Sequence, residues 1–310
     1  MPTQPSSSIT YTRSVARSAS VRRGSPGPLG EHPKEASGVA FSAPLVGLFL
    51  LIGGVIGFLS GLIGIGGGSF MIPALVAIFG AMIPSADLAV KMAFGTNLVV
   101  GAITAFTGFT VHRRHLSDRW RTVLPLAATS ILGALCGSTA ASHLPGGLLR
   151  IFFGIAALVV SASMLLKPEH DERPVPHLSP ALLLPLGLAI GFSASLVGLG
   201  GAVFTTIVLV SILRYPMRQV VGISTFVQTV GALFGALGYM INGLGKPGLP
   251  HFSVGYVNLL AAGGMMITGV PLARLGAVYT HRINATALKR VFAVALLAIA
   301  ILMIGGVGRK

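Results

Sequence analysis

The chain has 310 residues, of which 53% are hydrophobic and only 9% are charged, whereas a soluble domain carries roughly 25% charged residues. With a mean hydropathy of +0.84, this composition excludes a soluble enzyme, a disordered chain and a disulfide-stabilised secreted module, and it indicates a membrane protein. The net charge of +15 does not indicate nucleic-acid binding, because the basic residues lie mainly in a terminal tail and in short loops between apolar runs.

Residues 1–40 form a polar tail that is rich in Ser, Pro and Gly and has no apolar periodicity. Its five Lys and Arg residues outnumber its acids, Glu31 and Glu35. This composition predicts disorder. We interpret the segment as a basic tail near anionic lipid at the cytoplasmic surface, with an organellar transit peptide as the alternative.

From Phe41 onward, apolar runs follow one another with few polar residues between them. A helix needs about 20 residues to cross a bilayer, and most runs are long enough. They lack the alternation of strands, so we predict an all-α, multi-pass membrane protein with about eight spans and up to ten helical segments. The distribution of Lys and Arg favours eight crossings, and a five-plus-five arrangement with an inverted second half stays open. The runs cover residues 42–63, 69–84, 88–111, 122–143, 148–166, 180–197, 202–213, 219–241, 254–273 and 288–306.

An internal repeat organises these runs. GFLSGLIGIGGG at 57–68 matches GFSASLVGLGGA at 191–202, and GTN at 95–97 matches STF at 224–226. We therefore predict two homologous transmembrane halves, 41–166 and 180–306, joined by a polar linker at 167–179. Paired halves with glycine-interrupted segments at matching positions are typical of transporters whose substrate site lies between the halves.

The glycine motif, its echo and the downstream GTN and IST resemble the sulfite exporter TauE/SafE family of membrane transporters over about residues 41–306. The resemblance implies transport of a small sulfur-containing anion, such as sulfite or an organosulfonate. We expect location in the inner cell membrane rather than an organelle, with the lipid bilayer and a small anion as partners and no nucleic acid, cofactor, metal or catalytic activity. Ala202 replaces Gly68 and Phe226 replaces Asn97 in the second half, so the halves need not contribute equally.

A helix break at each glycine cluster would leave backbone N–H groups free at the start of the next segment, where the helix dipole is positive and favours an anion. In the alternative interpretation, the glycines only permit close helix packing and the hydroxyls bond to their own helices. The candidate substrate-binding residues are Gly64, Gly66, Gly67, Gly68, Ser69, Thr96 and Asn97 in the first half, and Gly198, Gly200, Gly201, Ser224, Thr225 and Gln228 in the second.

None of the seven acidic residues falls in the middle of an apolar run, which argues against a cation substrate and against a buried proton relay. Asp87 is a candidate gate or a helix N-cap, and Lys91 either attracts an anion or extends to the membrane surface. His112 and His115 fit a membrane-surface anchor better than a metal site. The one cysteine, Cys136, is expected in the core. An anion channel and a membrane-embedded assembly factor or enzyme are the alternative functions, and the sequence leaves the oligomeric state open.

Overall fold

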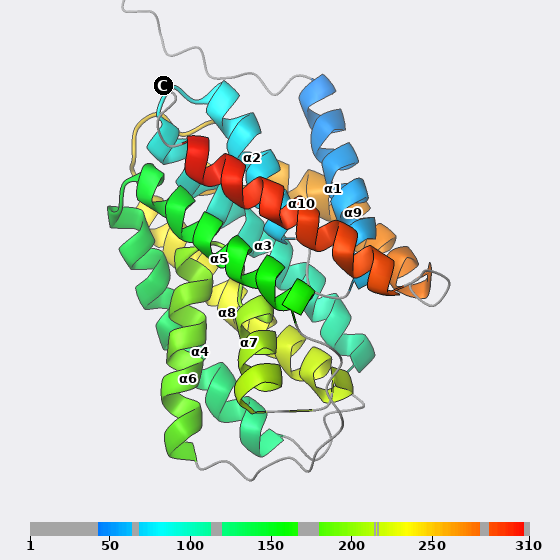
Figure 1. The fold of residues 1–310 in the computed structure, drawn as a ribbon. Coiled ribbons are helices and arrows are strands. Elements are labelled where there is room, and N and C mark those ends of the chain that lie inside the picture. The colour runs from blue at the N-terminus through cyan, green and yellow to red at the C-terminus, as the bar shows by residue number, and fades with distance from the viewer. Residues whose placement is uncertain are drawn as a thin grey trace, which may run out of the picture. The chain divides into compact units, whose positions relative to one another are not determined.

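The computed structural model describes residues 43–63, 68–112, 120–166, 180–213, 215, 217–279 and 285–306, all of which belong to one compact unit. The expected tail (1–40) and linker (167–179) lie outside these residues. The described chain is almost entirely helical (Figure 1). Its elements are α1 (Ala43–Ile63), α2 (Gly68–Met82), α3 (Ala86–His112), α4 (Trp120–His143), α5 (Gly146–Leu166), α6 (Pro180–Leu196), α7 (Ala202–Ile207) with the π-helical segment η2 (Val208–Ile212), α8 (Met217–Gly243), the antiparallel strands β1 (Ser253–Val254) and β2 (Val257–Asn258), α9 (Leu259–Tyr279) and α10 (Ala285–Gly305).

Six of these helices are long and apolar enough to cross a membrane: α1, α3, α4, α5, α8 and α9. Helices α2, α6 and α10 contribute shorter apolar stretches. Many large apolar side chains point outward, among them Leu51, Ile267 and Leu302, which are 64%, 70% and 72% exposed. Such a surface suits lipid better than water. The chain is therefore an all-α polytopic membrane protein, as the sequence predicts.

Glycines on α1 allow this helix to pack closely against α9. Gly53, Gly57 and Gly61 recur every four residues and therefore share one face of the helix. A Cβ atom on Gly57 would collide with the backbone of Gly269, and one on Gly61 with the backbone of Ala273. This is the small-residue packing by which helices associate in lipid, where apolar burial alone gives no driving force.

Helices α4 and α6 form a second close pair in the same way. A Cβ atom on Gly133 would collide with the carbonyl oxygen of Leu188, and one on Gly191 with that of Ser130. Helices α1 and α6 open the two halves expected from the repeat, and each packs against the fourth helix of the other half. Two equivalent halves would pack in this reciprocal way.

Two pairs of helices at matching positions in the expected halves run antiparallel to each other. Along the contact between α3 and α8, Gly95 lies beside Tyr239 and Gly108 lies beside Thr225, so the residue numbers rise along one helix as they fall along the other. Helices α5 and α10 also pack side by side and antiparallel (Figure 1). Helices α8 and α10 thus run in the opposite direction to their counterparts in the first half.

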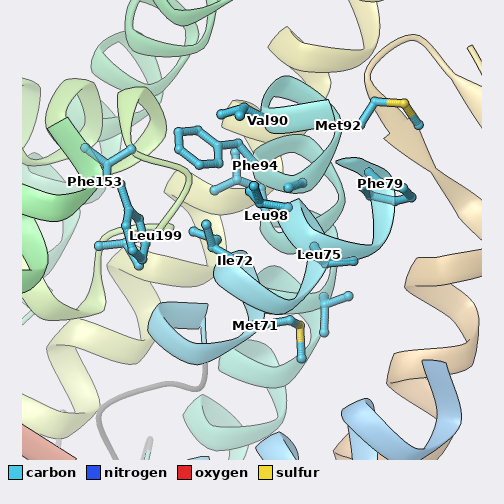
Figure 2. Packing of buried hydrophobic residues seen from close by; sticks show 14 of the residues in the cluster. Met71, Ile72, Leu75, Phe79, Val90, Met92, Phe94, Leu98, Phe153 and Leu199 are labelled. Atoms are coloured by element: carbon cyan, nitrogen blue, oxygen red, sulfur yellow. The ribbon is translucent and has the colours of Figure 1, made fainter. Parts of the chain in front are cut away.

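Helix α3 passes through the main hydrophobic core (Figure 2). Phe94 and Leu98 are fully buried on it, and the ring centroid of Phe94 lies 6.2 Å from that of Phe153 on α5. Ile72 on α2 and Leu199, from the segment between α6 and α7, belong to the same cluster. The core therefore holds α2 and the second glycine cluster against α3.

The cysteine side chain differs from the sequence expectation. Cys136 is exposed on α4 and does not pack in the core. It follows Leu132 by about one helical turn, and Leu132 is itself 58% exposed. Both residues lie on a face of α4 that no other described helix covers, so the apolar neighbours of Cys136 in the sequence reflect a lipid-facing surface.

Candidate functional site

The second glycine cluster interrupts the helical chain between α6 and α7. Gly198, Gly200 and Gly201 have φ angles of +73°, +77° and +111°, a backbone region that residues with a Cβ atom rarely adopt. Helix α6 ends at Leu196 and α7 begins at Ala202. The glycines therefore make the break possible, at the place where the sequence predicts it.

The first glycine cluster falls at the corresponding place between α1 and α2. Gly64, Gly66 and Gly67 lie outside the described residues, so their role stays a prediction. Helix α2 begins at Gly68, and the side chain of Ser69 is buried in its first turn. The N–H groups of a first helical turn have no partner within their own helix, so the start of α2 presents donors to whatever lies beside it.

The region around both clusters meets the side chain of Asn97 in the middle of α3. Asn97 Nδ2 donates a hydrogen bond to the carbonyl oxygen of Gly198, at 2.7 Å. A Cβ atom on Gly68 would lie 2.9 Å from the same nitrogen. Asn97 is only 2% exposed. One buried amide thus contacts the break of the second half and the start of α2.

A small cavity of about 20 Å³ lies beside Asn97. A volume of this size holds about one water molecule, so an anion of several atoms requires the walls to move apart. Helices α1, α2, α3 and α9 supply the walls. The lining residues are Ile56, Gly57 and Ser60 on α1, Gly68 and Met71 on α2, Asn97, Val100, Gly101 and Thr104 on α3, and Gly269 and Ala273 on α9.

Three of the lining side chains carry an oxygen atom that can accept a hydrogen bond: Ser60, Asn97 and Thr104. Asn97 uses its Nδ2 on Gly198, and its buried Oδ1 has no hydrogen-bond partner among the described residues. Thr104 Oγ1 donates to the carbonyl oxygen of Val100 at 2.9 Å, which leaves the hydroxyl lone pairs as acceptors. An unpaired buried acceptor costs about 1–3 kcal/mol, so the Asn97 oxygen is the atom of this site that most needs a partner.

The candidate residues of α8 divide into two groups. The Nε2 atom of Gln228 lies 3.4 Å from the position of a Cβ atom on Gly200 and 3.6 Å from one on Gly101. Gln228 therefore lies between the glycine break and the cavity wall. The hydroxyl groups of Ser224 and Thr225 instead donate to a carbonyl oxygen of their own helix, at 3.2 and 2.8 Å.

Thr96 binds a part of the chain far from its own helix. Its Oγ1 accepts a hydrogen bond from the backbone N–H of Asn258, at 3.0 Å. The Oδ1 of Asn258 accepts in turn from the N–H of Ala261, at 2.8 Å, and caps the start of α9. Although Thr96 and Thr225 match in the repeat, their hydroxyl groups have different partners.

Asp87 and Lys91 contact the junction of α4 and α5, and neither lines the cavity. Asp87 Oδ1 accepts a hydrogen bond from the N–H of Gly146, the first residue of α5, at 2.7 Å. The cap of α3 itself is Ser85, whose Oγ accepts from Leu88. Lys91 Nζ donates to a carbonyl oxygen of the last turn of α4 at 2.8 Å. The carboxylate therefore stabilises the start of a neighbouring helix, and its role as a gate stays a prediction.

Two further polar residues near the break were not singled out from the sequence. Ser195 and Thr205 are fully buried, and none of the described residues forms a hydrogen bond with their hydroxyl oxygens. Hydroxyl groups elsewhere in the helices, such as those of Thr107 and Ser138, bond to the carbonyl oxygen one turn earlier. The place of Ser195 within the second glycine motif was the one signal that could have found it.

In the part of the chain that the structure describes, no group of histidines forms a metal site. No three His, Cys, Asp or Glu side chains lie close enough there to hold an ion. His115 lies outside that part, so the interpretation of His112 and His115 as a membrane-surface anchor stays a prediction.

Comparison with known proteins identifies the family of this chain. It is 28% identical to a probable membrane transporter protein of Haemophilus influenzae over 256 residues, which cover 83% of this chain and 97% of that protein. A probable membrane transporter protein of Methanocaldococcus jannaschii is 27% identical over 246 residues, 77% of this chain and 88% of the relative. No solved structure matches the chain. The family model described as Sulfite exporter TauE/SafE matches residues 48–303. The chain therefore belongs to the sulfite exporter TauE/SafE family of membrane transporters.

Proposed function

We propose that this protein is a secondary transporter for a small, sulfur-containing anion such as sulfite or an organosulfonate, and that it acts in the inner cell membrane. The description of its family supports the substrate class. The observation that carries the proposal is the contact of Asn97 with both Gly198 and Gly68. Transporters built from two halves bind their substrate where interrupted helices of both halves meet.

Helix α2 supplies the main anion-binding groups in this proposal. It has 15 residues and begins at Gly68 on the cavity wall. Its free N–H groups and the positive end of its dipole favour negative charge, and Ser69 adds a hydroxyl donor. Gly64, Gly66 and Gly67 would let the backbone come close to the anion.

The second half contributes fewer groups in this state. Gln228, beside Gly200, has the side-chain amide of α8 that lies nearest the cavity, and Gly201 opens α7 at the break. We include three more residues in the proposed site for a state in which their present hydrogen bonds have exchanged: Thr96, Ser224 and Thr225.

The halves differ at the position of Asn97. Phe226 stands there in the second half and packs its ring against Phe109 and Trp120, with centroids 4.9 and 5.4 Å apart. An aromatic cluster of this kind offers an anion no hydrogen-bond donor except the Trp N–H. We therefore place the anion on the side of the first half.

Movement of the two halves would load and release the anion. The cavity admits about one water molecule, so the walls must separate for a larger guest. The antiparallel direction of α3 and α8 supports a five-plus-five inverted arrangement, in which rocking of one half against the other exposes a single site to each side in turn.

Transport assays in proteoliposomes test this function. Labelled sulfite, an organosulfonate and thiosulfate are supplied with and without a pH gradient. We expect saturable uptake of at least one of these anions that responds to an ion gradient. Flux that follows only the membrane voltage would favour the channel alternative, and transport of Na⁺ or an amine without any anion would contradict the proposed substrate.

A further inference from the structure

We propose that the cavity beside Asn97 takes its anion in a monoprotonated form, as an oxyanion that keeps one O–H group. This inference rests on the proposed function, because it concerns the same site and specifies the protonation state of the substrate. Within the proposed class it favours hydrogen sulfite over an organosulfonate, which has no O–H group. The proton would then cross the membrane on the substrate and not on a side chain of the transporter.

The orientation of the Asn97 amide is the first step. Only the NH₂ end of an amide can donate to a carbonyl oxygen, so the 2.7 Å bond to Gly198 fixes which end is nitrogen. The remaining Oδ1 lies 3.5 Å from the position of a Cβ atom on Gly68, and it has no hydrogen-bond partner in the described part of the chain. Both ends of the amide therefore lie against Gly68 at the start of α2, the nitrogen at 2.9 Å and the oxygen at 3.5 Å from that position, and both residues line the cavity.

Because Asn97 Oδ1 is a hydrogen-bond acceptor, its partner must be a donor or a cation. A fully deprotonated oxyanion offers only acceptors, and its oxygen atoms would repel Asn97 Oδ1. An oxyanion with one O–H can donate to Oδ1 and present its charged oxygens to the N–H groups at the start of α2. Na⁺ would also satisfy Oδ1, but it would lie at the positive end of the α2 dipole. The combination of donors on one side and an unpaired acceptor on the other favours the monoprotonated anion.

The proton has no other carrier among the described residues around the cavity. Helices α1 and α2 carry no titratable side chain within their bounds, and none of the residues that line the cavity is titratable. Five titratable residues with described side chains belong to the neighbouring helices, and none of them lines the cavity: Asp87 and Lys91 on α3, Tyr239 on α8, and Arg274 and Tyr279 on α9.

Two methyl oxyanions of the same shape provide the test. Methanesulfonate and methylphosphonate share the CH₃–XO₃ frame, and at mildly acidic pH both carry one negative charge. Only methylphosphonate then has an O–H group. Each compound competes with labelled sulfite for uptake by the full-length protein in proteoliposomes. We expect methylphosphonate to inhibit about tenfold more strongly than methanesulfonate, and to lose this advantage as rising pH converts it to the dianion.

The Asn97→Leu variant links this preference to the oxygen. The ratio of the two inhibition constants should fall to about one, and because both are measured in the same variant, a general loss of active protein cancels. Met71→Leu, which changes the same cavity wall without changing a hydrogen-bonding group, should keep the wild-type ratio. If Asn97→Leu does not fold, the pH dependence of inhibition by methylphosphonate in the wild-type protein still tests the inference.

The apparent affinity for sulfite itself is measured over the same pH range. The affinity should fall as rising pH converts hydrogen sulfite to sulfite. If neither methyl compound inhibits, this pH dependence of the sulfite affinity tests the inference on its own. Equal inhibition by the two compounds, or an affinity for total sulfite that does not change with pH, would overturn the inference and leave anion transport standing. Absence of uptake of every anion would instead overturn the proposed function.

Discussion

The side-chain nitrogen of Asn97 lies 2.7 Å from the carbonyl oxygen of Gly198, 101 residues further along the chain. This bond joins the middle of α3 to the break between α6 and α7. A backbone carbonyl at a helix break has no regular partner and needs one when it is buried. Asn97 supplies that partner, and the bond leaves its own oxygen unpaired beside the cavity.

Replacement of glycine at the break should cost stability through packing as well as backbone strain. Gly198 and Gly245 have φ angles of +73° and +72°, so alanine at either site carries a left-handed backbone cost of about 1–2 kcal/mol. A Cβ atom on Gly198 would lie 2.7 Å from the Cβ of Phe94, whereas one on Gly245 meets nothing within 4 Å. We expect Gly198→Ala to lower the stability by about 1–3 kcal/mol more than Gly245→Ala. Thermal unfolding in detergent measures the difference, and equal midpoints would show that the break does not pack on α3.

The glycine stripe of α1 gives a second comparison within one helix. Gly47→Ala, at a position with open space around it, should leave stability unchanged or raise it by up to about 1 kcal/mol through helix propensity. Gly57→Ala should destabilise the protein, because its Cβ would meet the backbone of Gly269. Detergent melting curves of the two variants test this, and a stabilising Gly57→Ala would rule out the close α1–α9 contact.

Thr96 should matter for both stability and substrate binding. Thr96→Val leaves the buried N–H of Asn258 without its acceptor, at a cost of about 1–3 kcal/mol. Thr96→Ser keeps the hydroxyl and should retain most of that stability. We also expect Thr96→Val and Thr225→Val to weaken the apparent substrate affinity about tenfold, and more than Thr107→Val does, because the Thr107 hydroxyl bonds to its own helix and the residue does not line the cavity. Substrate-induced thermal shifts measure the affinity. Wild-type shifts in both valine variants would remove these threonines from the site.

Thr205 offers a test of whether its unpaired hydroxyl serves the substrate. Thr205→Val keeps the shape of the side chain and removes a buried oxygen without a partner, so the variant should be as stable as the wild type or more stable. If the hydroxyl contacts the anion during transport, the uptake rate should fall severalfold despite that stability. Undiminished uptake would assign Thr205 to packing alone.

The apolar runs predict most of the helices. The glycine clusters, each followed by a short apolar run, also predict where α2 and α7 begin. The run at 254–273 fails at its start, since α9 begins only at Leu259. Phe252 and Gly255 have φ angles of +61° and +56°, and the hairpin they shape precedes the helix. Hydropathy does not distinguish a buried hairpin from a helical turn of the same composition.

The repeat predicts which residues occupy matching positions in the two halves, but it does not predict their hydrogen-bond partners. Thr96 and Thr225 correspond in the sequence, yet the partner of Thr96 comes from Asn258 at the start of α9, a contact that only the three-dimensional packing creates. Likewise the polar type of Ser195 and Thr205 is visible in the sequence, whereas the absence of a bond to their own helix is not. The residue type therefore indicates which side chains are polar within the spans, and the packing decides which of them have a hydrogen bond to spare.

Uptake of labelled sulfite by proteoliposomes that contain the wild type, Gly68→Val or Gly80→Val tests the central claim most directly. A Cβ atom on Gly68 would lie 2.9 Å from Asn97 Nδ2, whereas one on Gly80, in the same helix, meets nothing within 4 Å. We predict that Gly68→Val remains folded, as judged by its elution as a single species and its thermal midpoint, but loses uptake, because the added side chain fills the cavity where α2 begins. Gly80→Val should transport like the wild type. Wild-type uptake by Gly68→Val would contradict a substrate site at this point.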